Sequence, residues 1–457
     1  MSIYLKDVSG YERQARMTQT GIPALVSSLA IPTVVSQLVT VAYNIADTYF
    51  VSKLGKSATA AVGVVFSYQS IIQAVGFGLG MGASSLISRS LGARKLDKAN
   101  TYAGSSFFCA LAVGCVIMTI GLLFPHGLAA FLGATDTMLP YAVEYAKYIF
   151  LSSPIMCGAF VLNILLRSEG EAAYAMVGLC TGGVLNIFLD PLFIFKLDMG
   201  AAGAALATAI SQIVSFLMLL SVFILKKSII SIHPRHISRR LSDYWLIVST
   251  GFPTLCRQGL ASIATVLINI KGKLYGDAAV AALTIANKVY LLIRNIIIGI
   301  GQGFQPIAGY NYGAKKYSRV KKAFWFTTAI GSVICTGAGV LLFIHSEAVI
   351  AWLISDRDVI VLGSKALYIC ASVMPFMAYS TFVNQLYQCL GFRLSATFLA
   401  SCRQGVMFLP LIMILPNIWG LLGVQLSQPG ADLLTFFVSV PYQLRFMKTV
   451  LNRRDNT

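Results

Sequence analysis

The sequence predicts an all-α membrane protein with twelve transmembrane helices, arranged as two parallel six-helix repeats. Three observations predict this class: few charged residues, long continuous apolar runs, and an internal similarity between the two halves of the chain. Only 11% of the 457 residues are charged and 57% are hydrophobic, whereas a soluble domain carries roughly 25% charged residues. So little charge cannot cover a water-facing surface, and we expect lipid to cover most of it.

The apolar runs are continuous rather than alternating, which favours helices over the strands of a membrane barrel. A helical span needs roughly 20 apolar residues, and twelve segments are about that long. They lie at residues 22–48, 57–81, 100–123, 138–162, 174–195, 203–225, 244–270, 278–304, 323–344, 365–388, 395–416 and 420–444.

The net charge of +18 comes from short basic clusters between the apolar runs. Most of these lysines and arginines fall at the two ends of the chain and in alternate connections, which is the pattern of cytosolic segments in membrane proteins. We therefore expect a multi-pass protein of the plasma (cytoplasmic) membrane with both termini in the cytosol. Because the positive charge follows this pattern, we expect no nucleic-acid partner.

The second half of the chain repeats the first at an offset of 221 residues. Pro32 corresponds to Pro253, and a series of glycines corresponds at the same spacing. The matched glycines include Gly78, Gly80 and Gly82 with Gly299, Gly301 and Gly303, and Gly170 with Gly391. Small residues at such positions allow close packing of membrane helices. This many matches at one offset indicates an internal duplication.

Each half contains six predicted spans, an even number, so the halves share one orientation. Parallel repeats of this kind are a transporter architecture, with the substrate path between the halves. We predict a first lobe at residues 1–225, a cytosolic linker at 226–243 and a second lobe with a cytosolic tail at 244–457.

Ionisable residues inside the apolar runs cost at least roughly 2.5–3.5 kcal/mol each on insertion scales, so they mark candidate functional positions. Asp47 lies in the first span and Asp190 in the fifth, where Asn186 precedes Asp190 by one helical turn. Thr208 enters the sixth span to a comparable depth. These groups could bind a hard cation such as Na⁺, or hold a proton, because two close carboxylates in a low dielectric cannot both stay ionised cheaply.

The two acids have no counterparts in the second half, where Asp47 corresponds to Ile268 and Asp190 aligns near Leu411. A pair required only by the shared fold would be expected in both halves, which favours a functional role. The alternative interpretation is a buried polar pair satisfied by neighbouring Asn and Tyr side chains.

The second half carries mainly cations in its apolar runs, with Asp432 as the single deep acid. Asp432 could pair with Arg257 or Arg403, and a structural ion pair is favoured over a second coupling or substrate site. Pro32, in the middle of the first span, removes one helix hydrogen bond and permits a bend that would move Asp47. A static kink is the alternative.

Several segments resemble the multidrug and toxic compound extrusion (MATE) family, and most closely its bacterial and archaeal branch with an acidic first-lobe cation site. The segments that carry the resemblance include YNIADTYFVSKLG (43–55), SRSLGARKLDKA (88–99), GGVLNIFLDPLFIF (182–195), GQGFQPIAGYNYGAKKYSRVKKA (301–323) and QPGADLL (428–434). The resemblance implies a V-shaped, two-lobed transporter that exports amphipathic or cationic organic compounds by alternating access. Inward movement of H⁺ or Na⁺ would drive the export.

The resemblance also implies a set of site residues. The cation- or proton-coupling site corresponds to Asp47, Asn186, Asp190 and Thr208, with Tyr145 as a neighbour. If Na⁺ is the coupling ion, the first four would be its ligands. Candidate substrate-lining or network residues are Thr40, Asn44, Asn163, Pro32, Arg257 and Asp432. We expect no cofactor beyond the coupling ion, small organic substrates, a surrounding lipid bilayer and a monomer.

Three other classes of protein are alternatives. Another twelve-span exporter is the main alternative, such as a lipid-linked precursor flippase or a major-facilitator carrier. Major facilitator proteins typically carry a D-R-x-G-R-R-like signature between spans 2 and 3, whereas this chain has SRSLGARKLD (88–97). An intramembrane enzyme would need a motif such as H-E-x-x-H or G-x-S-x-G, and neither occurs. A membrane scaffold would not need buried acids.

Overall fold

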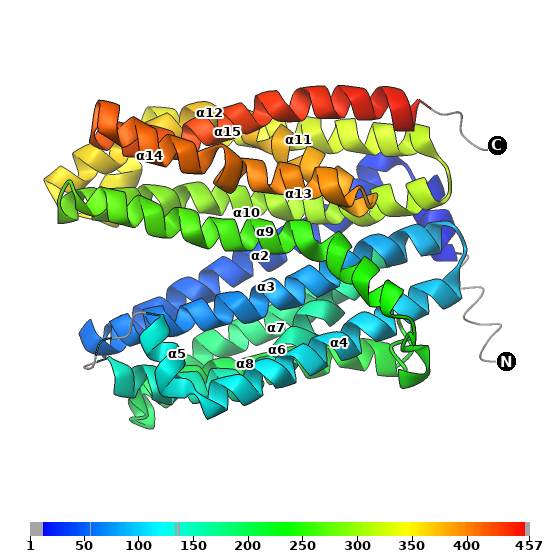
Figure 1. Ribbon diagram of the computed structural model, residues 1–457, viewed down its shortest axis with the longest axis horizontal. Coiled ribbons are helices and arrows are strands. Elements are labelled where there is room, and N and C mark those ends of the chain that lie inside the picture. Colours follow the sequence, from blue (N-terminus) through cyan, green and yellow to red (C-terminus); the bar gives the residue numbers. More distant parts are fainter. Residues whose placement is uncertain (1–11, 55, 133–134, 136–137, 453–457) are drawn as a thin grey trace. The chain divides into compact units, whose positions relative to one another are not determined.

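The computed structural model describes residues 12–54, 56–132, 135 and 138–452, and these residues form helices joined by short turns (Figure 1). The long helices of the first half are α2 (Ile22–Ser52), α3 (Lys56–Gly92), α4 (Leu96–Leu123), α6 (Leu139–Ser168), α7 (Ala172–Pro191) and α8 (Gly200–Ile224). Those of the second half are α9 (Leu241–Lys273), α10 (Asp277–Gly313), α11 (Tyr317–Leu353), α12 (Arg357–Cys389), α13 (Arg393–Ser401) with α14 (Phe408–Trp419), and α15 (Leu421–Phe446).

Short elements join or follow the long helices, and residues 12–19 near the start of the described chain are also helical. The short elements are α5 (Pro125–Phe131), the π-helical turns η1 (Leu192–Lys196), η3 (Cys402–Val406) and η4 (Met447–Leu451), and the 3₁₀ turn η2 (Pro234–His236). The turn η1 extends α7, and η3 joins α13 to α14 into one long segment. Every predicted span therefore falls on its own long helical segment in the described part of the chain, and the all-α prediction is confirmed.

Ten of these helices are long and apolar enough to cross a membrane, judged by length and composition over the described residues. The other two predicted spans correspond to α9 and α15, which are equally long but more polar. Arg257 lies within α9, and Gln425, Gln428 and Asp432 lie within α15. The polar residues that lower the hydropathy of these two helices include candidate functional residues.

The chain folds into two compact units. One contains Met1–Arg16 and Val35–Gly251, and the other contains Met17–Val34 and Phe252–Thr457, as far as these segments are described. The first half of α2 thus belongs with the second half of the chain, and the first turns of α9 belong with the first half. These boundaries differ from the predicted limits of 1–225 and 244–457, which assigned each span whole to one lobe.

The unit boundaries lie beside the two matched prolines. The first falls two residues after Pro32 and the second falls immediately before Phe252 and Pro253. A proline inside a helix removes one backbone hydrogen bond and weakens the helix at that turn. Each of these helices is therefore divided between two units at the position where its own hydrogen bonding is interrupted.

Each unit is built around one central helix. In the first unit α6 packs against α3, α4 and α8, and α7 packs against α8. In the second unit α12 packs against α10, α11 and α15, and α14 packs against α15. Because α6 and α12 correspond at the repeat offset, the duplication seen in the sequence is also a duplication of packing.

The matched glycines permit close helix contacts within each unit. In the first unit, a Cβ added at Gly82 of α3 would lie 2.0 Å from the carbonyl oxygen of Ile247 on α9. In the second unit, a Cβ added at Gly303 of α10 would lie 2.6 Å from the backbone nitrogen of Ala30 on α2. Thr33 donates a hydrogen bond to the Gly299 carbonyl at 2.6 Å across the same α2–α10 contact. The predicted role of these glycines in close packing is confirmed.

Candidate functional site

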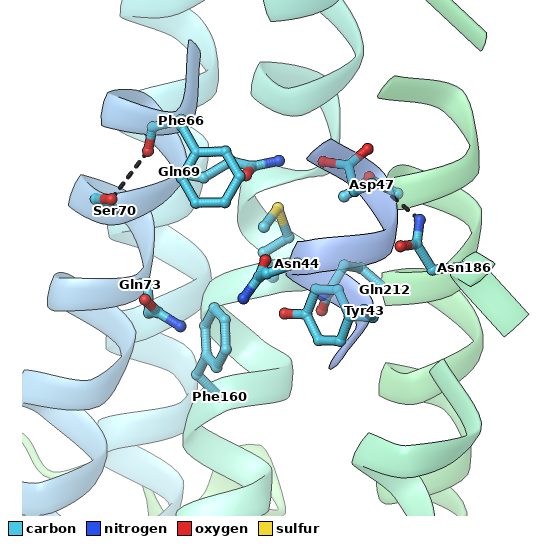
Figure 2. A pocket seen from close by; sticks show the side chains of 12 residues that line it. Tyr43, Asn44, Asp47, Phe66, Gln69, Ser70, Gln73, Phe160, Asn186 and Gln212 are labelled. Carbon is cyan, nitrogen blue, oxygen red and sulfur yellow. Dashed lines mark hydrogen bonds between the residues drawn. The ribbon is translucent and has the colours of Figure 1, made fainter. Parts of the chain in front are cut away.

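A pocket with about 500 Å³ of empty volume, part of it open to solvent, lies within the first unit (Figure 2). Its lining comes from α2, α3, α6, α7 and α8, and comprises Tyr43, Asn44, Asp47, Phe66, Gln69, Ser70, Gln73, Met156, Phe160, Asn186, Thr208 and Gln212. Only about 50 Å³ of this space can hold the centres of water-sized molecules. The chemistry of the lining, rather than the volume, therefore indicates what the pocket can bind.

Helix α7 and the turn after it position the amide and one acid. Asn186 and Asp190 are four residues apart, so their side chains lie on one face, and Asn186 Nδ2 donates to Asp190 Oδ1 at 3.1 Å. The same amide nitrogen lies 3.4 Å from Thr208 Oγ1 on α8. Pro191 follows the acid directly and the π-helical turn η1 begins at Leu192. Single π-helical turns of this kind frequently occur at functional sites.

The second acid, Asp47, is contributed by the part of α2 that belongs to the first unit. Its side chain is buried, at 5% exposed, and lines the same pocket as Asn186 and Thr208. Figure 2 shows Asp47 and Asn186 at one end of this pocket, on α2 and α7 respectively. The predicted convergence of Asp47, Asn186 and Thr208 is thus present in the structure, with Asp190 joined to it through Asn186.

Three buried acceptor oxygens at this end of the pocket have no hydrogen-bond donor among the described residues. They are Asp47 Oδ1, Asn186 Oδ1 and Asp190 Oδ2. A buried acceptor without a donor costs free energy, and a buried carboxylate costs more. The alternative interpretation, a polar pair fully satisfied by its neighbours, therefore does not fit the geometry.

Tyr145 of α6 is buried beside this cluster, at 1% exposed. Its hydroxyl lies near the side chains of Thr208 and Gln69 and close enough to Asp47 and Asp190 for electrostatic interaction. Tyr145 does not line the pocket itself, and it lies next to residues that do.

The remaining candidate residues separate into three groups. Asn44 lines the pocket, whereas Thr40 donates to the Ser36 carbonyl of its own helix at 2.9 Å and is absent from the lining. Pro32 lies in the part of α2 that belongs to the second unit. Arg257 and Asp432 also belong to the second unit, outside this pocket.

Asn163, a predicted network residue, does not line this pocket, and its amide nitrogen is bonded elsewhere. Asn163 Nδ2 donates to the Ala175 carbonyl at 2.7 Å, which ties α6 to α7. The corresponding residue of the second half, Asn384, donates to the Ala396 carbonyl at 2.8 Å. Because both halves contain the same bond, Asn163 serves the shared fold.

Sequence reasoning missed three glutamines that line the pocket. Gln69 and Gln73 are four residues apart on α3, and Gln212 follows Thr208 by four residues on α8. Amide side chains at helical spacing within an apolar run were the available signal, since a polar face inside a membrane helix usually points to a partner or a cavity.

The polar centre of the second unit has a different composition. Asp432 of α15 forms an ion pair with Arg403 of η3. The same carboxylate accepts hydrogen bonds from Tyr290, and from Gln428 at 3.2 Å. The predicted ion pair of Asp432 is present, and its partner is Arg403 rather than Arg257.

The described residues contain no group of three or more His, Cys, Asp or Glu side chains suited to a metal ion. The donors in the first unit are instead two carboxylates, one amide and one hydroxyl. Such hard oxygen donors suit an alkali cation or a proton rather than a transition metal.

Comparison of the whole chain with known proteins identifies its relatives. The MatE family model matches residues 32–192 and 253–414, so it matches twice, once from each of the paired prolines. The chain is 27% identical over 424 residues to "Multidrug export protein MepA" of Staphylococcus haemolyticus (strain JCSC1435), covering 92% of this chain and 93% of that protein.

Solved structures give the same result. One is described as "Outward-facing conformation of a multidrug resistance MATE family transporter of the MOP superfamily", with a TM-score of 0.89, 27% identity, and coverage of 95% of this chain and 98% of that one. Another is described as "Reverse polarity of binding pocket suggests different function of a MOP superfamily transporter from Pyrococcus furiosus Vc1 (DSM3638)". It has a TM-score of 0.90, 26% identity, and coverage of 96% and 99%.

Proposed function

Because this chain belongs to the MatE family of multidrug efflux transporters, we propose that it is an antiporter that exports amphipathic organic cations in exchange for H⁺ or Na⁺. The proposed coupling site is Asp47, Asn186, Asp190 and Thr208, with Tyr145 beside it. We further propose that the chain lies in the plasma membrane with both termini in the cytosol. The family assignment favours this function over a major-facilitator carrier and over an enzyme.

The observation that carries the proposal is the set of acceptor oxygens without donors on Asp47, Asn186 and Asp190. A proton on one carboxylate supplies a donor and removes a charge, and a Na⁺ ion among the oxygens compensates the charges directly. In either case a cation is the species that this site lacks. The first unit therefore has a physical reason to bind the coupling ion.

The pocket beside the acids suits an amphipathic cation. Phe66, Met156 and Phe160 supply apolar and aromatic surface, and Asp47 supplies a negative charge at one end. Methionine and aromatic side chains adapt to ligands of different shape, which favours broad specificity. The relatives named as multidrug export proteins are consistent with a substrate class of this kind.

Coupling follows if the ion and the substrate favour different states of the transporter. With the acids ionised, the pocket favours a cationic substrate. Loading the acids with H⁺ or Na⁺ removes the negative charge, weakens the binding of that substrate and shifts the population of conformations. The ion gradient then supplies the free energy for export.

The test is transport in liposomes that contain the purified protein, with a proton or a sodium gradient imposed separately and rhodamine 123 as the substrate. We expect gradient-driven transport by the wild-type protein, and its loss in Asp47→Asn and in Asp190→Asn. Asp198→Asn is a matched control, because Asp198 is exposed in the loop after η1 and its positive φ of 51° is tolerated by asparagine. Wild-type transport by both acid variants would overturn the proposal.

The two imposed gradients also identify the ion. Transport driven by the proton gradient alone assigns H⁺, and transport driven by the sodium gradient alone assigns Na⁺. Transport that is independent of both gradients would exclude coupling to either ion.

A further inference from the structure

The second unit contains more buried positive charge than its single deep acid can compensate. The Asp432 carboxylate accepts from Nε and Nη2 of Arg403, from the Tyr290 hydroxyl and from the Gln428 amide. Its two oxygens are therefore already engaged by four bonds. Arg403 also donates to the Tyr290 hydroxyl at 2.7 Å, which fixes the guanidinium against the ring.

Two further arginines of the same unit have no such partner. Arg294 of α10 exposes only 9% of its surface, and Arg257 of α9 is partly buried. Neither forms a hydrogen bond or an ion pair with any described residue. Both are close enough to Arg403 for electrostatic repulsion. Arg294 also lies near Arg257, and it is close enough to Asp432 for a partly compensating attraction.

The second unit therefore has three guanidinium groups and one carboxylate within its spans, and only Arg403 is paired with that carboxylate. Arginine stays charged at any physiological pH, so this excess charge cannot be relieved by losing a proton. An ionisable residue within a membrane span is a candidate for a functional site. The nitrogens of Arg257 and Arg294 are not among the fully buried unpartnered atoms, so a ligand can reach them. A negatively charged ligand would supply the missing partner.

The position of this cluster within the duplicated fold supports a binding site. Tyr290 and Arg294 stand at the positions that Gln69 and Gln73 occupy in the first half. After the one-residue deletion in the second half, Gln428 and Asp432 stand at the positions of Thr208 and Gln212. All four first-half residues line the pocket of the first unit. Of the three arginines, Arg294 alone stands at such a position, together with Asp432, the ion-pair partner of Arg403.

We propose that Arg257, Arg294 and Arg403 form a binding site for the oxyanion group of an amphipathic organic molecule. A guanidinium presents paired N–H donors that match the oxygens of a carboxylate, sulfonate or phosphate. The surrounding helices are apolar, so the rest of the ligand is expected to be apolar as well. Resting on the proposed export function, this inference adds amphipathic anions to the substrate classes of the transporter.

The same chemistry could come from a free organic anion or from the headgroup of an anionic phospholipid. Both present an oxyanion at the end of an apolar body. The experiment therefore separates these two sources by the lipid composition of the membrane.

The test uses two xanthene dyes of similar ring structure and opposite charge, fluorescein and rhodamine 123. Equilibrium binding of each dye is measured with the full chain in phosphatidylcholine nanodiscs, with no ion gradient. We expect Arg294→Gln and Arg257→Gln each to weaken fluorescein binding roughly tenfold, which is typical for loss of a charged hydrogen bond. Arg294→Lys keeps the charge and should retain part of the affinity. Rhodamine 123 binding should be unchanged in all three variants, which also shows that they are folded.

Nanodiscs that contain phosphatidylglycerol give the second arm. Reduced fluorescein binding in these nanodiscs, for the wild-type protein alone, would assign the lipid headgroup as an occupant of the same site. Unchanged binding would assign the site to free organic anions. Equal fluorescein binding by the wild type and both glutamine variants would overturn the proposal.

These outcomes are separate from those of the transport experiment. Binding without a gradient does not require coupling, so failure of the anion site would leave gradient-driven rhodamine 123 transport intact. Failure of the coupling proposal would leave fluorescein binding to the arginines unchanged.

Discussion

The two duplicated units solve the problem of a polar centre inside a membrane in opposite ways. In the first unit, Asp47 and Asp190 lie together without any basic partner, and three of the acceptor oxygens there have no donor in the described chain. In the second unit, Asp432 is fully engaged by Arg403, Tyr290 and Gln428. One unit therefore lacks positive charge and the other has an excess of it.

The comparison teaches which polar residues serve the fold and which serve function. Asn163 and Asn384 make the same bond in both units, so this bond belongs to the duplicated scaffold. The acid pair and the arginine cluster each occur in one unit only. Polar residues that differ between equivalent positions are the ones that the two units have adapted to separate tasks.

The largest effect is expected from a variant that adds a positive charge to the first unit, because this removes the charge difference between the two units. Gln69 lines the pocket near Tyr145, and Figure 2 shows it facing Asp47 across the upper part of the pocket. Gln69→Arg would place a guanidinium beside the acids. This guanidinium would neutralise the acids and repel the cationic substrate and the coupling ion. Because two like charges placed together cost several kcal/mol, we expect rhodamine 123 transport to fall at least about 100-fold. Gln69→Met is the neutral control of similar length, and equal transport by the two variants would contradict the account.

The second unit should respond to loss of charge with loss of stability. Arg403→Gln leaves the Asp432 carboxylate buried, at 1% side-chain exposure, without its ion-pair partner. Breaking a buried pair in this way typically costs about 3–5 kcal/mol. The double variant Arg403→Gln/Asp432→Asn should recover most of this loss. Thermal unfolding in a neutral detergent measures both variants, and a double variant no more stable than the single one would refute the pairing.

The glycine contacts test the packing that the two units share. Gly82→Ala would place a methyl group against the Ile247 carbonyl, and overpacking of this kind costs about 1–3 kcal/mol. Gly63→Ala on the same helix meets no atom within 4 Å and should be neutral or slightly stabilising. The difference in unfolding temperature between the two variants is the measurement. Equal temperatures would show that α3 and α9 are farther apart than described.

The paired asparagines should behave alike. Asn163→Ala and Asn384→Ala each remove a buried side-chain hydrogen bond to a carbonyl of the next helix, at a cost of about 0.5–1.5 kcal/mol. We expect similar losses of thermal stability in both variants and no change in the ion dependence of transport. If Asn163→Ala alone loses the ion dependence of transport, Asn163 belongs to the coupling site.

The smallest effect concerns a buried acid outside the spans. Burial raises the pKa of Glu169 to about 7, and nearby Arg13 together with Ser228 and the Ile229 amide limits the rise. The folded state thus holds this proton more tightly than the unfolded state. Its contribution to stability is present at low pH and is lost as the pH rises through about 7.

Glu169→Gln should therefore flatten the dependence of the unfolding temperature on pH between about 5 and 8, with a change of a few degrees at most. Glu144→Gln, at an exposed position of α6, is the matched control. If both variants show the same pH dependence as the wild type, Glu169 does not titrate in this range.

Much of the fold could be predicted from the sequence. The length of the apolar runs indicates the helices, and the matched glycines indicate the duplication. Asp47 and Asp190 could be predicted because a charge inside a span is costly, so few explanations fit it. The division of α2 and α9 between the two units, near Pro32 and Pro253, could not be predicted. It depends on which helices pack together in space, and hydropathy does not report this. The partner of Asp432 also stayed open, because the π-helical turn η3 changes the direction of Arg403 relative to a regular helix.

The central claim is that the acid pair of the first unit binds the cation that substrate displaces. The most direct measurement is release of H⁺ or of radioactive Na⁺ from the protein in nanodiscs when rhodamine 123 is added. The account predicts release from the wild-type protein and from Arg294→Gln, and none from Asp190→Asn. Equal release from Asp190→Asn and the wild type would contradict it.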